Sequence, residues 1–215
     1  MKGLIFDLDG VIVDTAEFHY VAWKKAGEEL GLNLTRAQNE NLKGISRQDS
    51  LNKILEWAGV TLDRTDFERI MREKNQCYLS LVEQLTPASA LPGVQEFIQN
   101  ARNAGYRLAI GSASKNAPII LEKLELTPSF DVVIDGNSVK SAKPNPEVFT
   151  RAADLLDIRY DQCVVFEDSE AGIEAAKRAG MVAVGIGTRS NLPKADWVFP
   201  GFENISIEFI NQLQK

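Results

Sequence analysis

The sequence predicts an α/β protein with a Rossmann-like parallel sheet core and a helical cap inserted after the first strand. Short apolar runs alternate with helical patterns along most of the chain, which is typical of a parallel sheet. One segment, residues 15–85, breaks this alternation because it contains helical patterns without convincing strands. The chain has 215 residues, of which 44% are hydrophobic, so it can bury a substantial core.

The expected strands are apolar at successive positions, as in strands that helices cover on both faces. Helical patterns separate these strands; Val94, Phe97, Ile98 and Ala101, for example, follow the spacing of one helix face. Gly180 suits the position just beyond the end of a helix expected over residues 171–179. The expected strands are residues 3–6, 107–111, 132–135, 163–166 and 182–186.

The segment without strands contains two apolar stripes at helical spacing. The first covers residues 51–58, and Ser46 with Asp49 resembles a capping box at its start. The second covers residues 67–81. We therefore expect a cap of residues 15–85 and a core of residues 1–14 and 86–215. Two chain crossings, near residues 13–15 and 86–90, would connect them.

Charge and composition limit the kinds of molecule that the protein is expected to bind. The formal net charge of −6 argues against a general nucleic-acid or anionic-membrane binder, although a few cations can still hold a small anionic substrate. The chain has no apolar run of membrane-spanning length, and its start reads into a strand without a signal-peptide cleavage pattern. Cys77 and Cys163 form no metal-ligand spacing and fit a reduced compartment. We expect a cytoplasmic protein, with a monomer as the default.

Two acidic clusters follow expected strands. Asp7 and Asp9 lie in an Asp7-Leu8-Asp9-Gly10 turn, and Glu167-Asp168 follows the strand at residues 163–166. Ligands gather at the carboxyl ends of strands in open parallel sheets. Like unit charges 4 Å apart repel by about 4 kcal/mol at an effective dielectric of 20, and a bound divalent cation would relieve this repulsion. Oxygen ligands alone favour Mg²⁺ over zinc. An acidic turn that caps a helix remains the alternative for the first cluster alone.

Two further segments could bind phosphate. Ser112 and Ser114 precede a helical pattern in Ser112-Ala113-Ser114-Lys115-Asn116, where hydroxyls and free backbone N–H groups can hold an anion. Each serine could instead be an ordinary N-cap. Lys143 precedes Pro144, so it lies in extended backbone, where a lysine is usually a solvated loop charge.

Taken in order, the D-x-D-G, S-x-S, K-P and E-D motifs resemble the haloacid dehalogenase-like phosphotransferase superfamily across the whole chain, cap included. This resemblance implies that Asp7 attacks phosphorus to form an aspartyl phosphate. It implies that Asp9 is the general acid and base. Ser112 and Lys143 would hold the transferring phosphoryl group. The Lys143-Pro144 peptide bond is expected to be cis.

The same resemblance implies a Mg²⁺ site. The carboxylates of Asp7 and Asp168 and the backbone carbonyl of Asp9 would hold the ion, and Glu167 would support them.

The cap more closely resembles that of the β-phosphoglucomutase family, through residues 14–19, Trp23, residues 42–47 and Lys74-Asn75. This implies conversion of β-glucose 1-phosphate to glucose 6-phosphate through glucose 1,6-bisphosphate, which also acts as primer. A mutase needs a second phosphate site, which the resemblance assigns to Arg47, Ser114, Lys115 and Asn116. The substrate-binding residues expected on this basis are His19, Trp23, Gly44, Ile45, Ser46, Arg47, Lys74, Ala113, Ser114, Lys115 and Asn116.

Several alternatives stay open at the level of sequence. His19 could be an ordinary partly buried histidine, and Lys74 could extend from its apolar stripe to solvent. A sugar-phosphate phosphatase of the same superfamily would use the same aspartates with water as acceptor. A phospho-acceptor receiver domain would be shorter and would lack the cap, and a non-catalytic sugar-phosphate-binding protein would not need the full catalytic set.

Overall fold

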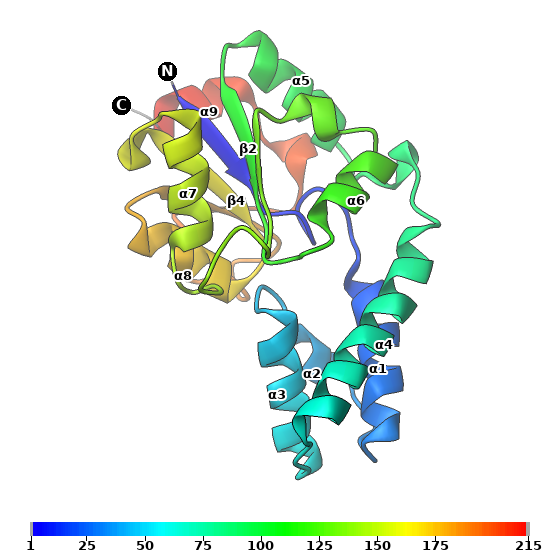
Figure 1. Ribbon diagram of the computed structural model, residues 1–215. Helices are drawn as coiled ribbons and strands as arrows, with labels where there is room; N and C mark the ends of the chain where they lie inside the picture. The colour runs from blue at the N-terminus through cyan, green and yellow to red at the C-terminus, as the bar shows by residue number, and fades with distance from the viewer. Residues whose placement is uncertain (1, 214–215) are drawn as a thin grey trace.

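The computed structural model describes residues 2–213 and contains a six-stranded parallel sheet in the order β3-β2-β1-β4-β5-β6 (Figure 1). This is the strand order of a doubly wound Rossmann-type sheet, so the predicted fold class is confirmed. The strands are β1 (Gly3–Phe6), β2 (Arg107–Gly111), β3 (Val132–Ile134), β4 (Cys163–Glu167), β5 (Val182–Ile186) and β6 (Trp197–Phe199).

Each strand expected from the sequence is present, within one residue at its end, and β6 is an addition. It has only three residues, pairs with β5 at the sheet edge and leaves Trp197 47% exposed. A strand this short, with one neighbour and a half-exposed side chain, has no continuous apolar run to mark it.

Helices cover both faces of the sheet. On one face lie α5 (Val94–Asn103), α6 (Ala117–Lys123) and α9 (Ile207–Leu213), and on the other lie α7 (Glu147–Leu156) and α8 (Glu170–Arg178). Successive strand residues face opposite sides, because Leu4 and Phe6 join the first hydrophobic cluster and Ile5 joins the second. Gly180 follows the C-cap of α8 with φ 72°, as predicted. Short 3-10 helices cover Pro87–Ser89, Thr127–Ser129, Tyr160–Gln162 and Phe202–Asn204.

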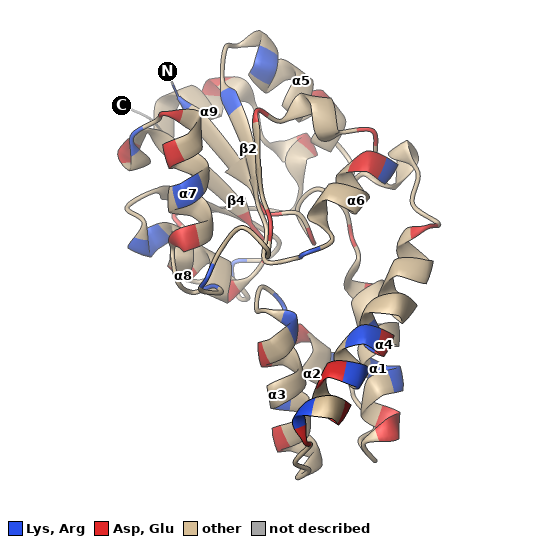
Figure 2. Cartoon of the chain, viewed as in Figure 1, with Lys and Arg blue, Asp and Glu red and all other residues tan. Residues whose placement is uncertain are grey.

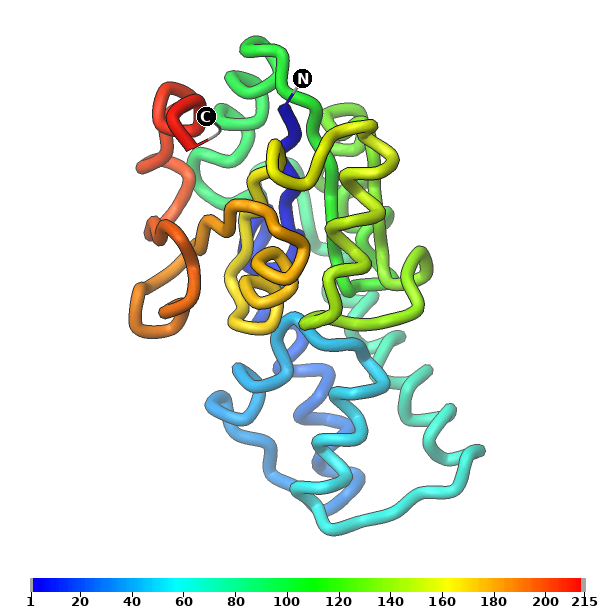
Figure 3. The backbone as a smooth tube through the Cα atoms, turned by 90° about the vertical axis from the view of Figure 1, so that its left-hand side faces the viewer, coloured from blue at the N-terminus to red at the C-terminus, as the bar shows by residue number. Residues whose placement is uncertain are grey.

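Four helices follow β1: α1 (Ala16–Glu29), α2 (Arg36–Glu40), α3 (Arg47–Ala58) and α4 (Arg64–Val82). Figures 1 and 3 show them as a bundle at one end of the molecule, while both chain ends lie at the opposite end. The bundle has its own hydrophobic cluster, which includes Trp23, Leu51 and Ile70. Ser46 is the N-cap of α3, as predicted, and accepts from Asp49 N at 3.1 Å. Its hydroxyl also donates to the Asp49 carboxylate at 2.6 Å.

The two connections to the bundle run next to each other. Val13 and Ala90 form an antiparallel bridge, and Leu91 N donates to Ile12 O at 2.9 Å. Gly10, with φ 81°, makes the tight turn after β1 and donates to Val13 O at 2.8 Å. The chain therefore leaves and re-enters the sheet at neighbouring points.

Charge on the bundle is mixed: Figure 2 shows lysines and arginines interspersed with aspartates and glutamates along its helices. Within residues 2–213, the helices are all too short or too polar to cross a membrane.

Candidate active site

The two acidic clusters meet where β1 and β4 end. Phe6 pairs with Phe166 in register, and Asp7 N donates to Phe166 O at 2.9 Å, so Asp7 and Glu167 leave the sheet side by side. One carboxylate oxygen from each of Asp7, Glu167 and Asp168 lies within 4.8 Å of the others. The sheet thus brings together groups that are about 160 residues apart in sequence. This edge is also where the strand order reverses, which is the usual ligand site of such sheets.

Lys143 lies among these carboxylates. Its Nζ is 2.5 Å from Asp7 Oδ1, 2.8 Å from Glu167 Oε2 and 4.7 Å from the centre of the Phe149 ring. The residue is only 3% exposed, and its peptide bond to Pro144 is cis, as expected from the resemblance. Lys143 is therefore a buried partner of the acidic cluster and not a solvated loop charge.

The electrostatics of this cluster are compatible with a bound cation. Burial, followed by the Glu167 carboxylate, holds the pKa of Asp7 well above its usual value. Burial and Glu167 also raise the pKa of Asp168 to about 7. Burial tends to lower the pKa of Lys143, but the Asp7 and Glu167 carboxylates raise it above its usual value. The ammonium of Lys143 thus shares the cluster with three carboxylates, and hard oxygen ligands of this kind suit Mg²⁺.

Asp9 lies beside the cluster, and its carboxylate is outside the three-carboxylate group. The Thr15 hydroxyl donates a hydrogen bond to Asp9 Oδ1. Burial raises the pKa of Asp9, whereas the bond from Thr15 and the charge of Lys74 act in the opposite direction. Asp9 is therefore a partly buried carboxyl group with a raised pKa, which suits a group that gives and takes protons.

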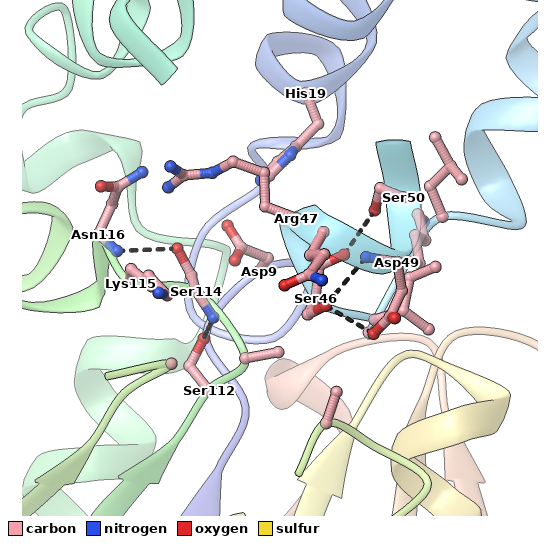
Figure 4. Close-up of a pocket in the computed structure, with 18 of the residues that line it drawn as sticks. Asp9, His19, Ser46, Arg47, Asp49, Ser50, Ser112, Ser114, Lys115 and Asn116 are labelled. Carbon is pink, nitrogen blue, oxygen red and sulfur yellow. Dashed lines mark hydrogen bonds between the residues drawn. The ribbon is translucent and has the colours of Figure 1, made fainter. Parts of the chain in front are cut away.

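The segment after β2 forms the wall of the site on the side of the sheet (Figure 4). Ser112 Oγ accepts from Ser114 N at 3.0 Å, and Ser114 Oγ accepts from Asn116 N at 3.2 Å. Neither serine is the N-cap of α6, a position that Asn116 occupies. Ser112, Ser114, Lys115 and Asn116 lie together at the start of this helix, where backbone N–H groups favour anions.

The helical bundle supplies the opposite wall. Arg47 is the first residue of α3, and Figure 4 shows its side chain directed toward the Ser114–Asn116 side. His19 and Lys74 lie side by side in this wall, with Lys74 Nζ 3.1 Å from His19 Nδ1 and 4.6 Å from the Trp23 ring. Lys74 is 4% exposed, so it faces the interior and does not extend to solvent. Burial and then Arg47 lower its pKa to about 7, and burial holds the pKa of His19 well below its usual value.

These two walls enclose a cavity of about 440 Å³. Asp7, Asp9, Asp168 and Ser112 line it, while Lys143 and Glu167 lie behind Asp7. Each predicted substrate-binding residue also lines it, namely His19, Trp23, Gly44, Ile45, Ser46, Arg47, Lys74, Ala113, Ser114, Lys115 and Asn116.

Three contacts of the site were not predicted. Thr15 holds Asp9, as described above. Lys43 Nζ lies 3.5 Å from Asp168 Oδ2 and 3.0 Å from Glu40 Oε2. Asn116 Nδ2 donates to Asn75 Oδ1 at 2.9 Å. The last two connect the helical bundle with the sheet domain. Lys43 and Asn75 lie within the segments that carry the resemblance, but nothing in their local pattern indicates the partner of either side chain.

Comparisons of sequence and of structure with known proteins find relatives that agree with one another. The sequence profile described as haloacid dehalogenase-like hydrolase matches residues 4–186. A β-phosphoglucomutase of Bacillus subtilis is 40% identical over 214 residues, which are 99% of this chain and 95% of the relative. The crystal structure of a β-phosphoglucomutase from Clostridium difficile has a TM-score of 0.96 at 36% identity, covering 100% of this chain and 97% of that one. A fructose-1-phosphate phosphatase, YqaB of Escherichia coli, is 33% identical over 86% of this chain and 95% of its own length.

Proposed function

The chain belongs to the haloacid dehalogenase-like hydrolase family, and on that premise we propose that it is a β-phosphoglucomutase. It would interconvert β-D-glucose 1-phosphate and glucose 6-phosphate through glucose 1,6-bisphosphate, which also serves as the primer. The observation that carries this proposal is the cavity itself. Asp7 lies at one side, and Arg47 faces Ser114, Lys115 and Asn116 across the space, so a second phosphate has a place to bind.

We propose the following chemistry for the residues around Asp7. An Asp7 carboxylate oxygen attacks phosphorus of the substrate, and the bond between phosphorus and the departing sugar oxygen breaks. Asp9 gives its proton to that oxygen and, in the return step, takes a proton from the attacking sugar hydroxyl. Lys143, held beside Asp7, and the Ser112 hydroxyl stabilise the charge on the phosphoryl group.

Mg²⁺ fits the donor set of this site. The carboxylates of Asp7 and Asp168 with the Asp9 backbone carbonyl would hold the ion, and Glu167 would support them. When bound, the ion neutralises charge on the phosphoryl oxygens.

We also propose that residues 15–85 act as a cap on a core of residues 1–14 and 86–215. An aspartyl phosphate is open to attack by water, so a mutase has to exclude water while a sugar hydroxyl attacks. Contacts of Lys43 with Asp168 and of Asn75 with Asn116 would hold the cap against the core. The partners would be small sugar phosphates, with no nucleic acid or membrane, and the protein would act as a cytoplasmic monomer.

The test is conversion of β-glucose 1-phosphate to glucose 6-phosphate with Mg²⁺ and the bisphosphate primer, with release of inorganic phosphate followed in parallel. A mutase gives glucose 6-phosphate with little phosphate release. Rapid phosphate release without isomerisation would instead support a sugar-phosphate phosphatase, an activity that the YqaB relative carries in its name.

Arg47→Ala separates the two functions further. In a mutase this variant should lose most of its isomerisation, because Arg47 would hold the non-reacting phosphate. In a phosphatase it should hardly affect the hydrolysis of a small monophosphate. Arg64→Ala is the matched control, since Arg64 is the first residue of another cap helix, α4, and its exposed side chain pairs with Glu68.

A further inference from the structure

Asn39, in α2, is a buried residue with a side-chain polar atom that has no hydrogen-bond partner among the described residues. The residue is 5% exposed, and its Oδ1 is buried without a hydrogen-bond partner among the described residues. Residues 2–213 contain three such buried side-chain atoms, the others being Tyr78 Oη and Arg107 Nε. Of these three residues, only Asn39 lines the active-site cavity. Buried polar atoms are nearly always hydrogen-bonded, to protein or to ordered water, so a molecule that enters the cavity is a candidate partner for this one.

The backbone around Asn39 is firmly held. Asn39 N donates to Thr35 O at 3.0 Å, and Asn39 O accepts from Leu42 N at 2.9 Å. One turn earlier, Arg36 pairs with Glu17 of α1, at 2.5 and 3.1 Å, and lies 4.5 Å from the Tyr20 ring. Residues three apart share a helix face, so Asn39 also lies toward α1, which contributes Trp23 to the cavity. The side chain is therefore presented from a fixed support.

The chemistry of the surrounding wall points to a neutral donor. On the cap side the cavity is lined by the apolar residues Trp23, Leu42, Ile45 and Met71 together with polar and charged residues. The cations Arg47 and Lys115 are available for phosphate, and a neutral amide oxygen adds little to anion binding. A buried amide oxygen in the cavity wall instead suits the O–H group of a sugar, because the hydroxyl satisfies an acceptor that is already desolvated.

We infer that Asn39 Oδ1 accepts a hydrogen bond from one hydroxyl group of the bound sugar and that Asn39 is a specificity-determining residue of this site. The inference rests on the proposed function. It assigns Asn39 to recognition of the sugar ring and not of a phosphate. A site built to hydrogen-bond a hydroxyl group discriminates against analogues that lack it, because the buried acceptor is then left unpaired.

The test compares how much affinity is lost when one hydroxyl group is removed from the ligand, in proteins with and without Asn39. Binding is measured, so no turnover is needed. Calorimetry gives the affinity of the Asp7→Asn protein and of the Asp7→Asn, Asn39→Leu protein, both with Mg²⁺, for glucose 6-phosphate and its 1-, 2-, 3- and 4-deoxy analogues. With Asn39 present, one analogue should bind about tenfold more weakly than glucose 6-phosphate. In the protein that also carries Asn39→Leu, that analogue and glucose 6-phosphate should bind about equally.

Asn41→Ala, in the Asp7→Asn background, is the control. Asn41 follows α2, is exposed and donates to Ala37 O at 3.1 Å, and it does not line this cavity. It should leave the pattern of analogue affinities unchanged. Identical penalties for every analogue with and without Asn39 would overturn the inference. Failure of glucose 6-phosphate to bind at all would count against the proposed function itself, so the two failures can be told apart.

Two further measurements separate recognition from a structural role. Because Oδ1 has no partner within residues 2–213, Asn39→Leu should leave the melting temperature of the free protein unchanged or raise it. The affinity for inorganic phosphate should also stay within about twofold. A fall of several degrees, or an equal loss of affinity for phosphate and sugar phosphates, would show that Asn39 supports the cap and does not read the sugar.

Discussion

The ammonium group of Lys143 lies 2.5 Å from Oδ1 of Asp7, the carboxylate that would attack phosphorus. Both side chains are buried, and Lys143 also contacts Glu167 at 2.8 Å. The lysine can thus orient the nucleophile and limit repulsion between the two carboxylates.

Replacing Lys143 tests this arrangement. Lys143→Met should lower the free energy of unfolding by about 3–5 kcal/mol without Mg²⁺, because two buried carboxylates lose the cation that contacts them both. Added Mg²⁺ should restore part of this loss, and kcat should fall by at least about 100-fold. Denaturant titrations with and without Mg²⁺ measure the first effect. Lys123→Met, which breaks an exposed pair with Glu83, should cost at most about 1 kcal/mol, and an equal loss in the two variants would contradict the prediction.

Binding of Mg²⁺ should depend on pH. The pKa of Asp168 is raised to about 7 and that of Asp7 is also raised, so protons compete with the metal below neutral pH. The apparent affinity for Mg²⁺ should therefore increase from about pH 6 to about pH 8 and then level off. Calorimetric titrations at several pH values check this. Asp168→Asn should bind the ion weakly and with a smaller pH dependence, whereas a flat profile for the unaltered protein would be inconsistent with these raised pKa values.

Lys74 should make the protein more stable as the pH rises above 7. Its folded-state pKa is about 7, well below the ordinary value near 10.5, so in this range the unfolded chain binds more protons than the folded one. Unfolding then becomes less favourable with each increment of pH up to about 9. Melting temperatures of the free protein and of Lys74→Met at about pH 7, 8 and 9 measure the difference. The rise should be smaller in Lys74→Met and unchanged in the exposed-site control Lys25→Met; parallel curves would refute it.

Thr15 should influence the pKa of Asp9, the proposed acid–base group. Its hydroxyl donates to Asp9 and lowers the pKa of that carboxyl, so Thr15→Val should raise the pKa of Asp9 further. The limb of the pH–rate profile that reports Asp9 should move to higher pH, whereas Thr15→Ser should restore it. Measurements of kcat/KM from about pH 5 to about pH 9 distinguish this from general damage, which would lower the rate at every pH without moving the limb.

The sequence predicted the sheet and the meeting of Asp7 with Glu167 because both depend on local patterns. Each predicted strand is marked by an apolar run, and parallel strands place their carboxyl ends at one edge, so residues that follow two strands converge. The same reasoning places the Ser112 segment at that edge, after β2.

Other contacts have no local signal. The hydrogen bond of Asn75 with Asn116 and the ion pair of Lys43 with Asp168 join surfaces whose relative position depends on how the helical bundle packs against the sheet. Neither Asn75 nor Lys43 interrupts a periodic pattern. The Asn39 oxygen, which has no partner within residues 2–213, is similar, since an asparagine near a helix end usually indicates a cap or a turn. Strand β6 was missed for a different reason, its short length at the sheet edge.

The bridge between Val13 and Ala90 has a consequence for how such proteins diversify. Because the chain leaves and re-enters the sheet at adjacent positions, the whole segment between them is attached at one place. Replacing that segment would leave the strand ends that carry Asp7 and Glu167 in place and would change the residues that cover the substrate. The pairing of two short loop segments would thus allow the choice of sugar to evolve separately from the chemistry performed on its phosphate.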